Sequence, residues 1–445
     1  MDPSRLNWLG AADAARAIRD GAVSSEELTA ACLARVREAD PAIQAWAFLD
    51  PEHALAQARI LDQMRRAGGV LGPLHGVPVG VKDIIDTTDM PAECGSVLHA
   101  GRRPSADAAV VSMLRAAGAV IMGKTTTTEF ATYAPSKTRN PQDPAHTPGG
   151  SSSGSAAAVA AGMVPLALGT QTNGSVIRPA AYCGVYGFKP THGLIPRTGI
   201  LALSRALDHV GVFARTLEDV ALACEPLAGF DVRDPDTHPR ASIPFRELAA
   251  AEPPLPPLIG FVKGPLWERA EPETREAFAE LVQAIAGRVV EIELPRTALA
   301  ALDVHRTIME AEMAANLAWE YEHGRERLSA SLRGQLERGR AVTALDYQNA
   351  LARIPLLNAG FEEIFERCDA LLAPAAAGTA PRGLESTGDP AFCTLWTLCG
   401  MPSLSMPLMR GAGGLPLGVQ LIGARNEDAR LLRTARWVAA QVSQD

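Results

Sequence analysis

The chain has 445 residues, of which 47% are hydrophobic, and its 42 basic and 50 acidic residues give a formal net charge of −8. This composition is typical of a folded globular protein and excludes a disordered or fibrous chain. An acidic chain without a long basic run has no electrostatic footprint for nucleic acid or for an anionic membrane surface. We therefore expect a small-molecule substrate, no nucleic acid partner and no membrane partner.

The cysteines and the first residues indicate the compartment. Seven cysteines are scattered along the chain without a C-x-x-C pair, which favours neither a disulfide framework nor a zinc site. The start "MDPSRLNWLG" lacks the basic and apolar regions of a signal peptide. The longest apolar run, from Ala156 to Leu168, contains Pro165 and falls short of the roughly 18 residues that span a membrane. We expect a soluble, cytoplasmic protein.

The first half of the chain begins with helices and then alternates strands with helices. Apolar residues recur at helical spacing from Ala11 to Ala67, and "SSEE" at 24–27 predicts a capping box. The runs "GVPVGVKDII" and "GAVIMGKTTTT" predict strands, with a helix between them in "SADAAVVSMLRAAG". An alanine-rich helix to about Ala161 and a strand in "MVPLALGTQT" follow. This alternation predicts an α/β sandwich with a largely buried sheet.

The second half is mainly helical between Glu225 and Ala370, with strand candidates in "PLIGFVKG" and "RVVEIELP". Strand patterns return in "DALLAPA", "PSLSMPL" and "GLPLGVQLIG", and "EDARLLRTARWVAAQV" predicts a closing amphipathic helix. No linker separates independent domains. We therefore expect one domain over 1–445, with a helical N-terminal segment at 1–70 and a mainly helical region at roughly 225–370 over the substrate pocket.

Two short motifs match formally but lack the structural context they need. Gly118 to Thr125, "GAVIMGKT", satisfies the phosphate-loop pattern, yet its middle residues are typical of a buried strand. Gly150 to Gly154, "GSSSG", would place Ser152 at a nucleophile elbow. Three prolines between 141 and 148 exclude the central strand that such an elbow follows. No histidine stands out as a base, so neither motif predicts the function.

A third group of residues joins three segments. "GVPVGVKD" places Lys82 in an apolar strand, "TPGGSSSGSAAAVAAG" supplies hydroxyl groups, and "GTQTNGSVIRPAAYCGVYGFKPT" places Ser175 after a glycine. A lone lysine in such a strand could extend its ammonium group to solvent or pair with Asp83. Here the lysine occurs together with serines in glycine-rich turns, which favours a catalytic interpretation.

These segments resemble the amidase signature family of hydrolases. The likeness continues in "LRAAGAVIMGKTTTTEFA", "SRALDHVGVFARTLEDVA", "LWTLCGMPSLSMPL" and "GLPLGVQLIG", and it runs over most of the chain in the family's order. The resemblance implies a single large α/β/α sandwich, with a mixed central sheet covered by helices. It also implies that no metal or organic cofactor takes part.

The resemblance further implies the catalytic roles. Ser175 is the expected nucleophile, Lys82 the base, and Ser151 the relay between them after a cis Gly150–Ser151 peptide. The backbone N–H groups of the segment 172–175 are expected to form the oxyanion hole. The members of that segment are Thr172, Asn173, Gly174 and Ser175. Supporting roles are expected for Gly150, Ser152, Asp83 and Gln171.

The chemistry explains why such residues are needed. A serine hydroxyl attacks an amide only after it loses its proton. A lysine accepts that proton only when neutral, and burial shifts its pKa in the required direction. We expect cleavage of an amide or a related C–N bond, such as an anilide or carbamate, through an acyl-enzyme, by a chain that could form a homodimer. The alternative is the glutamine-hydrolysing A subunit of a tRNA-dependent amidotransferase complex.

One segment departs from the family pattern G-T-D-x-G-G-S-I-R. This chain has Gln171 in place of the acid, Asn173 in place of a glycine and Ile177 in place of the arginine, while Arg178 follows one position later. Because an acid and a base are lost together, we hypothesise that neutral residues replace a charged pair. The rival hypothesis is that Arg178 interacts with Gln171.

Overall fold

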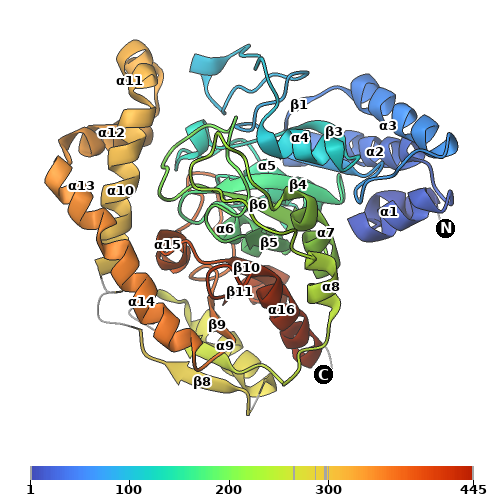
Figure 1. The fold of residues 1–445 in the computed structure, drawn as a ribbon. Helices are drawn as coiled ribbons and strands as arrows, with labels where there is room; N and C mark the ends of the chain where they lie inside the picture. Colours follow the sequence, from blue (N-terminus) through green and yellow to red (C-terminus); the bar gives the residue numbers. More distant parts are fainter. Residues whose placement is uncertain (1–2, 264–265, 286, 295–297, 299, 443–445) are drawn as a thin grey trace.

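An 11-stranded mixed sheet runs through the computed structural model, which describes residues 3–263, 266–285, 287–294, 298 and 300–442. Figure 1 labels its helices and strands. The strands are β1 (Trp46–Leu49), β2 (Pro78–Lys82), β3 (Val120–Thr125), β4 (Leu166–Gln171), β5 (Tyr186–Lys189), β6 (His209–Ala214), β7 (Ile259–Val262), β8 (Val289–Ile292), β9 (Ala370–Pro374), β10 (Ser403–Arg410) and β11 (Pro416–Ile422).

The described helices are interspersed with these strands along the chain. They are α1 (Ala11–Arg19), α2 (Ser25–Ile43), α3 (Pro51–Arg66), α4 (Ala109–Ala116), α5 (Ser153–Ala160), α6 (Ile177–Cys183), α7 (Leu217–Leu227), α8 (Phe245–Ala250), α9 (Pro272–Ala284), α10 (Ala301–Asn316), α11 (Ala318–Gly324), α12 (Ala330–Ala341), α13 (Ala344–Leu351), α14 (Arg353–Phe365), α15 (Ala391–Leu398) and α16 (Asp428–Val442). Short 3-10 turns are η1 (Pro3–Trp8), η2 (Val97–His99), η3 (Glu129–Ala131), η4 (Trp267–Arg269), η6 (Arg325–Arg327) and η7 (Ala412–Gly414).

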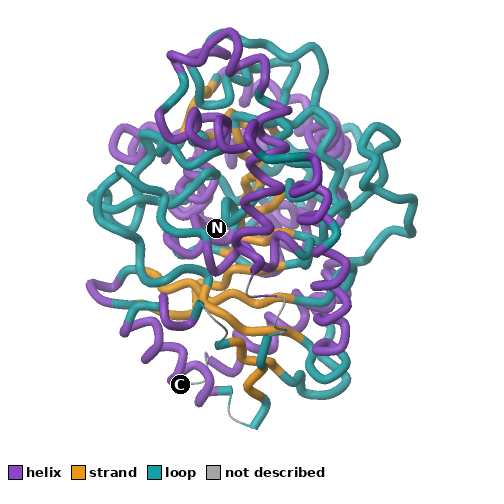
Figure 2. The backbone as a smooth tube through the Cα atoms, turned by 90° about the vertical axis from the view of Figure 1, so that its left-hand side faces the viewer, coloured by secondary structure: helices purple, strands orange, loops and turns teal. Residues whose placement is uncertain are grey.

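The strand order is β1-β3-β2-β4-β6-β5-β10-β11-β9-β7-β8. Strand β2 pairs in parallel with β3 and β4, whereas β4 pairs antiparallel with β6. Strands β7, β8 and β9 form a second parallel group at the other end of the sheet. The predicted α/β fold with a mixed central sheet is therefore confirmed. Figure 2 shows the strands following one another through the interior between helices.

Helices α10 to α14 form a column on one side of the molecule, away from α1 to α3 (Figure 1). They belong to the stretch between residues 225 and 370, where β7 and β8 are the strands. Those two strands extend the common sheet beside β9, which comes after the stretch. The helical column is thus attached to the sheet at both of its chain ends.

Local signals explain several boundaries. The predicted capping box is present, because Ser24 Oγ accepts from Glu27 N–H while the Glu27 carboxylate accepts from Ser24 N–H. Strands β1, β5 and β6 were not predicted. The first two have only four residues, and β1 lies inside a helical pattern, so their short periodicity is hard to detect. Among the described residues, no helix is both long and apolar enough to cross a membrane.

Candidate active site

The ends of two neighbouring parallel strands bring the predicted base to a pair of hydroxyl groups. Lys82 is the last residue of β2, and Thr170 lies near the end of β4. Lys82 Nζ donates to Ser151 Oγ at 2.8 Å and to Thr170 Oγ1 at 2.9 Å. Thr170 was not among the predicted site residues, although its place one residue before Gln171 in the same motif could have suggested it.

The environment of Lys82 favours a neutral amine. Its side chain has no solvent exposure, and burial lowers its pKa well below the ordinary value, while the charge of Asp208 opposes that shift. A neutral amine in a buried site can accept a proton, and the ammonium group that results is held by two hydroxyl acceptors. The role of Lys82 as the base stays a prediction, with which these contacts agree.

Ser151 lies in the turn before α5, and its peptide bond with Gly150 is cis, as the resemblance implied. The preceding residue, Gly149, has a φ of 79°, a conformation that favours glycine. The carbonyl oxygen of Gly150 accepts a hydrogen bond from Arg178 Nη2 at 2.8 Å. Arg178 thus holds the turn that presents Ser151 to Lys82.

The next two serines have structural contacts. Ser152 is the N-cap residue of α5, yet it makes no side-chain cap bond. Its hydroxyl instead donates to the Thr170 carbonyl at 3.1 Å and accepts from the Thr170 N–H at 3.2 Å. Ser153 Oγ donates to the Gly149 carbonyl at 2.8 Å. Ser152 and Ser153 therefore hold the strand end and the turn, and neither hydroxyl caps the helix.

Ser175 and the segment before it are available for a reacting carbonyl group. Ser175 is 8% exposed. In the part of the chain that the structure describes, its hydroxyl makes no hydrogen bond, and the backbone N–H groups of 172–175 have no acceptor in the protein. Free N–H donors beside a serine hydroxyl are what an oxyanion hole needs.

This segment is held by two residues that the sequence did not indicate. His305, on α10, contacts the Thr172 carbonyl through Nε2 at 2.8 Å. Burial lowers the pKa of His305 to about 4, so the ring is neutral and its Nε2–H is the donor. Thr397, on α15, donates from Oγ1 to the Asn173 carbonyl at 2.5 Å. No local pattern identifies partners that lie more than 130 residues away in sequence.

The residues that depart from the family pattern have well-defined contacts. Gln171 Oε1 accepts from the N–H groups of Val176 and Ile177 at 2.7 and 3.0 Å, and its Nε2 donates to Thr397 Oγ1 at 2.9 Å. Ile177 packs in a small apolar cluster with Ala181, Ala375 and Cys393. Among the described residues, no hydrogen bond joins Gln171 to Arg178. The structure therefore lacks the contact that the rival hypothesis, an interaction of Arg178 with Gln171, requires.

Asp83 and the phosphate-loop motif lie outside this hydrogen-bonded group. The nearest cation to Asp83 is Lys124, with Nζ 4.0 Å from Oδ1, and burial raises the pKa of Asp83 to about 6. Within the described ranges, no ion pair joins Asp83 to Lys82. Lys124 lies in β3, where its Nζ also donates to the Ile85 carbonyl. The motif at 118–125 is thus a buried strand, as its composition indicated.

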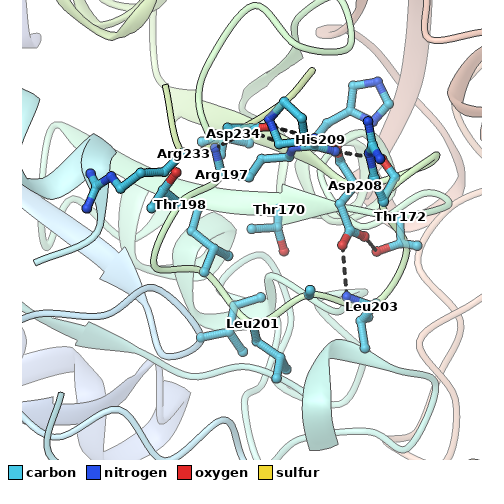
Figure 3. A pocket seen from close by; sticks show the side chains of 16 residues that line it. Thr170, Thr172, Arg197, Thr198, Leu201, Leu203, Asp208, His209, Arg233 and Asp234 are labelled. Atoms are coloured by element: carbon cyan, nitrogen blue, oxygen red, sulfur yellow. Dashed lines mark hydrogen bonds and ion pairs between the residues drawn. The ribbon is translucent and has the colours of Figure 1, made fainter. Parts of the chain in front are cut away.

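Two cavities flank the oxyanion segment. One, of about 190 Å³, is bordered by Thr170, Thr172 and Asp208 (Figure 3). The other, of about 410 Å³, lies beside Asn173, whose Nδ2 donates to the Tyr133 hydroxyl at 2.9 Å. Its lining carries both signs of charge, from Arg269, Arg338, Glu310 and Asp389. The predicted region 225–370 contributes Arg269, Glu310 and Arg338 to that lining.

Comparisons with known proteins give the family. The family model described as "Amidase" matches residues 27–432. The chain is 37% identical to the A subunit of the glutamyl-tRNA(Gln) amidotransferase of Chloroflexus aggregans, over 97% of this chain and 96% of the relative.

Two solved structures show the same fold. A peptide amidase from Stenotrophomonas maltophilia is 32% identical, with a TM-score of 0.84 over 97% of this chain and 96% of that one. A structure of a vestigial protein complex, bearing on the origins of an s-triazine catabolic enzyme, is 28% identical, with a TM-score of 0.90 and 98% of both chains covered.

The relative's name corrects the expected partners. We expected no nucleic acid partner, but the Chloroflexus protein is one component of an enzyme named for a tRNA. The expectation of no nucleic acid was therefore wrong. The net charge of a chain indicates only whether the chain itself would bind RNA directly. It could not reveal an assembly in which another protein binds the RNA.

Proposed function

Because the chain belongs to the amidase family, we propose that it hydrolyses a carboxamide through an acyl-enzyme on Ser175. The observation that carries the proposal is the buried Lys82 amine, 2.8 Å from Ser151 Oγ. Ser151 would relay a proton between Ser175 and Lys82. The N–H groups of the segment 172–175 would hold the oxyanion.

The steps balance with these residues alone. Ser175 Oγ attacks the carbonyl carbon, its proton passes to Ser151, and the proton of Ser151 passes to neutral Lys82. The tetrahedral intermediate collapses when the relay returns a proton to the departing nitrogen, which leaves as ammonia or an amine. Water then attacks the ester on Ser175 through the same relay, and the carboxylic acid is released.

We propose glutamine as the carboxamide, with the chain acting as the glutamine-hydrolysing component of a tRNA-dependent amidotransferase. The identity of 37% over 97% of the chain supports this assignment. Mixed charges in the cavity beside Asn173 also suit an amino acid, which carries both an ammonium and a carboxylate group. A partner protein would then bind the tRNA and use the ammonia.

A second candidate is hydrolysis of another small amide by this chain alone. The solved peptide amidase, 32% identical with a TM-score of 0.84, supports it. So does the exchange of three residues in the segment around Ser175, at Gln171, Asn173 and Ile177. Ammonia release from glutamine separates the candidates when it is measured with and without the other subunits of a glutamyl-tRNA(Gln) amidotransferase.

The nucleophile is tested separately from the substrate. Ser175→Ala should abolish hydrolysis and covalent labelling by a fluorophosphonate probe, whereas Ser152→Ala should retain both, because its hydroxyl bonds Thr170. A panel of amides, anilides, carbamates and esters then gives the substrate class. Labelling that persists at Ser152 in the Ser175→Ala protein would refute the assigned nucleophile.

A further inference from the structure

Asp208 places a carboxylate close to the proposed base. It precedes β6, which pairs antiparallel with β4, so it lies beside Thr172 just past the last pair of that ladder. Thr172 Oγ1 donates to Asp208 Oδ1 at 2.6 Å. Asp208 borders the cavity of about 190 Å³ together with Thr170, whose hydroxyl accepts from Lys82 Nζ at 2.9 Å (Figure 3). The cavity is therefore bordered both by a carboxylate and by a hydroxyl that contacts Lys82.

The contacts of the Asp208 side chain favour its ionised form. Its Oδ2 accepts from the backbone N–H groups of Leu203 and Ser204 at 2.8 and 2.9 Å. Burial raises the pKa of Asp208, and these two hydrogen bonds oppose that rise together with the one from Thr172. The side chain is partly buried and borders the cavity, so a negative charge faces that space.

Helix α10 fixes the loop that carries Asp208. Asn316 Nδ2 donates to the Leu203 carbonyl at 3.0 Å, and the Glu312 carboxylate accepts from the Ala206 N–H at 3.2 Å. Both Asn316 and Glu312 lie on α10. A loop that is held at two positions keeps the carboxylate at a fixed place beside the cavity.

The other charged and titratable groups around Lys82 and Asp208 are paired with one another or neutral. The ion pairs are Arg197 with Asp234 and Asp236, Arg205 with Asp236, Arg233 with Asp231, and Lys124 with Asp83. His209 and His305 are neutral rings, because burial lowers the pKa of both. The carboxylate of Glu312 accepts from Tyr347 and from the loop at 204–206.

Asp208 differs from these acids in having no close cation. Among the described residues, no basic side chain lies within 4.0 Å of its carboxylate. Arg197, the nearest in the loop, donates instead to the backbone carbonyl of Asp208, at 3.2 Å. The charge of Asp208 therefore acts on the cavity without a counter-ion in contact.

We infer that the Asp208 carboxylate acts on Lys82 across this cavity, as a positioning residue that stabilises the protonated amine between the two proton transfers. The inference rests on the proposed role of Lys82 as the base. Burial alone weakens an amine as a base, because its ammonium form loses solvation. A carboxylate beyond a low-dielectric wall restores part of the proton affinity, and the charge of Asp208 raises the pKa of Lys82 against the effect of burial.

The test measures the protonation of Lys82 directly, so it does not depend on turnover. The chain contains five lysines, which are Lys82, Lys124, Lys137, Lys189 and Lys263. Lysine labelled with carbon-13 at Cε therefore gives few NMR signals, and Lys82→Met assigns one of them by its loss. Asp208→Asn keeps the shape of the side chain and removes its charge. In this variant the Lys82 titration should move to lower pH, with a loss of proton affinity of about threefold or more.

Two controls separate this effect from a general change in the site. Asp234→Asn removes a carboxylate from the lining of the same cavity, but that carboxylate is paired with Arg197, so the Lys82 titration should not move. The Lys189 signal is an internal control in Asp208→Asn, since the acid that acts on Lys189 is Asp428. An unchanged Lys82 titration in folded Asp208→Asn would overturn the inference, and so would an equal shift in Asp234→Asn.

Folding and function are distinguished by two further measurements. If Asp208→Asn does not fold, Asp208→Ser replaces it, because a hydroxyl still accepts from the loop N–H groups without carrying a charge. The same shift is expected there, and its absence would overturn the inference. The pH dependence of amide hydrolysis tests the proposed function separately. A Lys82 signal that shifts while the rate profile does not would support the action of Asp208 and refute Lys82 as the base.

Discussion

Two strands of the same sheet end in a buried lysine, and their surroundings differ in one chemical respect. Lys82 ends β2 and Lys189 ends β5, and both side chains have no solvent exposure. Burial lowers both pKa values, to about 7 for Lys189. Lys82 donates to two hydroxyl groups, whereas Lys189 donates to the carbonyls of Met401 and Pro190.

The difference supports the proposal that Lys82, and not Lys189, acts as a base, although both lysines are buried. A hydroxyl group can both accept a hydrogen bond and give up a proton, whereas a backbone carbonyl can only accept. Lys82 therefore has a proton source in Ser151, and Lys189 has none among its hydrogen-bond partners. These contacts support the proposed proton transfer at the end of β2, whereas the Lys189 contact at the end of β5 holds the Met401 carbonyl.

The largest expected effect separates the two lysines. Lys82→Met should lower kcat by about 10²- to 10⁴-fold, the usual contribution of a general base. Lys189→Met should lower kcat by less than about tenfold. Lys189 contacts only backbone carbonyls, and larger losses are typical of groups that transfer the proton. Steady-state kinetics on the identified amide check this, with circular dichroism as the folding control. Equal losses in kcat for the two folded variants would remove the distinction.

The activity should also depend on pH through Lys82. Because its pKa is lowered, the neutral base is present above the shifted pKa, and the rate should fall as pH decreases through it. Residual activity in Lys82→Met should lose this dependence. A profile with an apparent pKa near 6.5 that is unchanged in the variant would instead indicate a histidine.

The next-largest effect on kcat is expected for Ser151, the serine that accepts a hydrogen bond from Lys82. Ser151→Ala removes the proton acceptor beside Lys82 and should lower kcat by about 10²-fold or more. Ser152→Ala, whose hydroxyl bonds only the Thr170 backbone, should change kcat by less than about tenfold and act mainly on stability. The comparison of kcat with thermal unfolding for each variant separates the roles. A larger kcat loss in Ser152→Ala would contradict the relay.

Lys189 should contribute to the way stability depends on pH. Its pKa of about 7 in the folded state lies below the ordinary value of 10.5, so between those pH values the unfolded chain binds the extra proton. Stability should therefore rise with pH in this window, by up to about 1.4 kcal/mol per unit. Lys82, whose pKa is also lowered, contributes to the same rise, so Lys189→Met should reduce the rise without abolishing it. Denaturant unfolding at several pH values from 7 to 10 measures the free energy of unfolding. The same pH dependence in the unmodified chain and in Lys189→Met would exclude a contribution of Lys189.

The smallest expected effect concerns Gln171, the neutral residue that stands in place of the family's acid. Gln171→Asp would bury a carboxylate that loses the Thr397 contact, so unfolding should occur at a lower temperature and kcat/KM should fall. Adding Ile177→Arg should restore part of the loss, with a coupling of about 1 kcal/mol. Unfolding and kinetics of both single variants and the double variant give the coupling. Additive effects would refute the hypothesis of paired replacement.

The sequence predicted the fold class because alternating strands and helices have clear periods, and the capping box at Ser24 is local. Strands β1 and β5 escaped prediction, since four-residue runs carry too little pattern. The positions of Lys82, Ser151 and Ser175 followed from the family resemblance. The burial of Lys82 followed from its apolar strand, and its contact with Ser151 followed from the resemblance. The contacts made by Thr170, His305 and Thr397 did not follow, because they depend on the packing of distant segments.

The same limit applies to the residues around the catalytic segment. Thr397 and His305 reach it from helices that are more than 130 residues away in sequence. Arg178 was predicted as a possible partner of Gln171, yet its contacts are Gly150 and Thr387.

The hydrogen bond from His305 to the Thr172 carbonyl has a mechanical consequence. A trans peptide directs its C=O and N–H to opposite sides, so a held Thr172 carbonyl fixes the direction of the Asn173 N–H. His305 belongs to α10, which also lines the cavity beside Asn173. A change in α10 that reshapes this cavity for another substrate would therefore also turn a donor at the reaction centre, and selectivity and rate should change together.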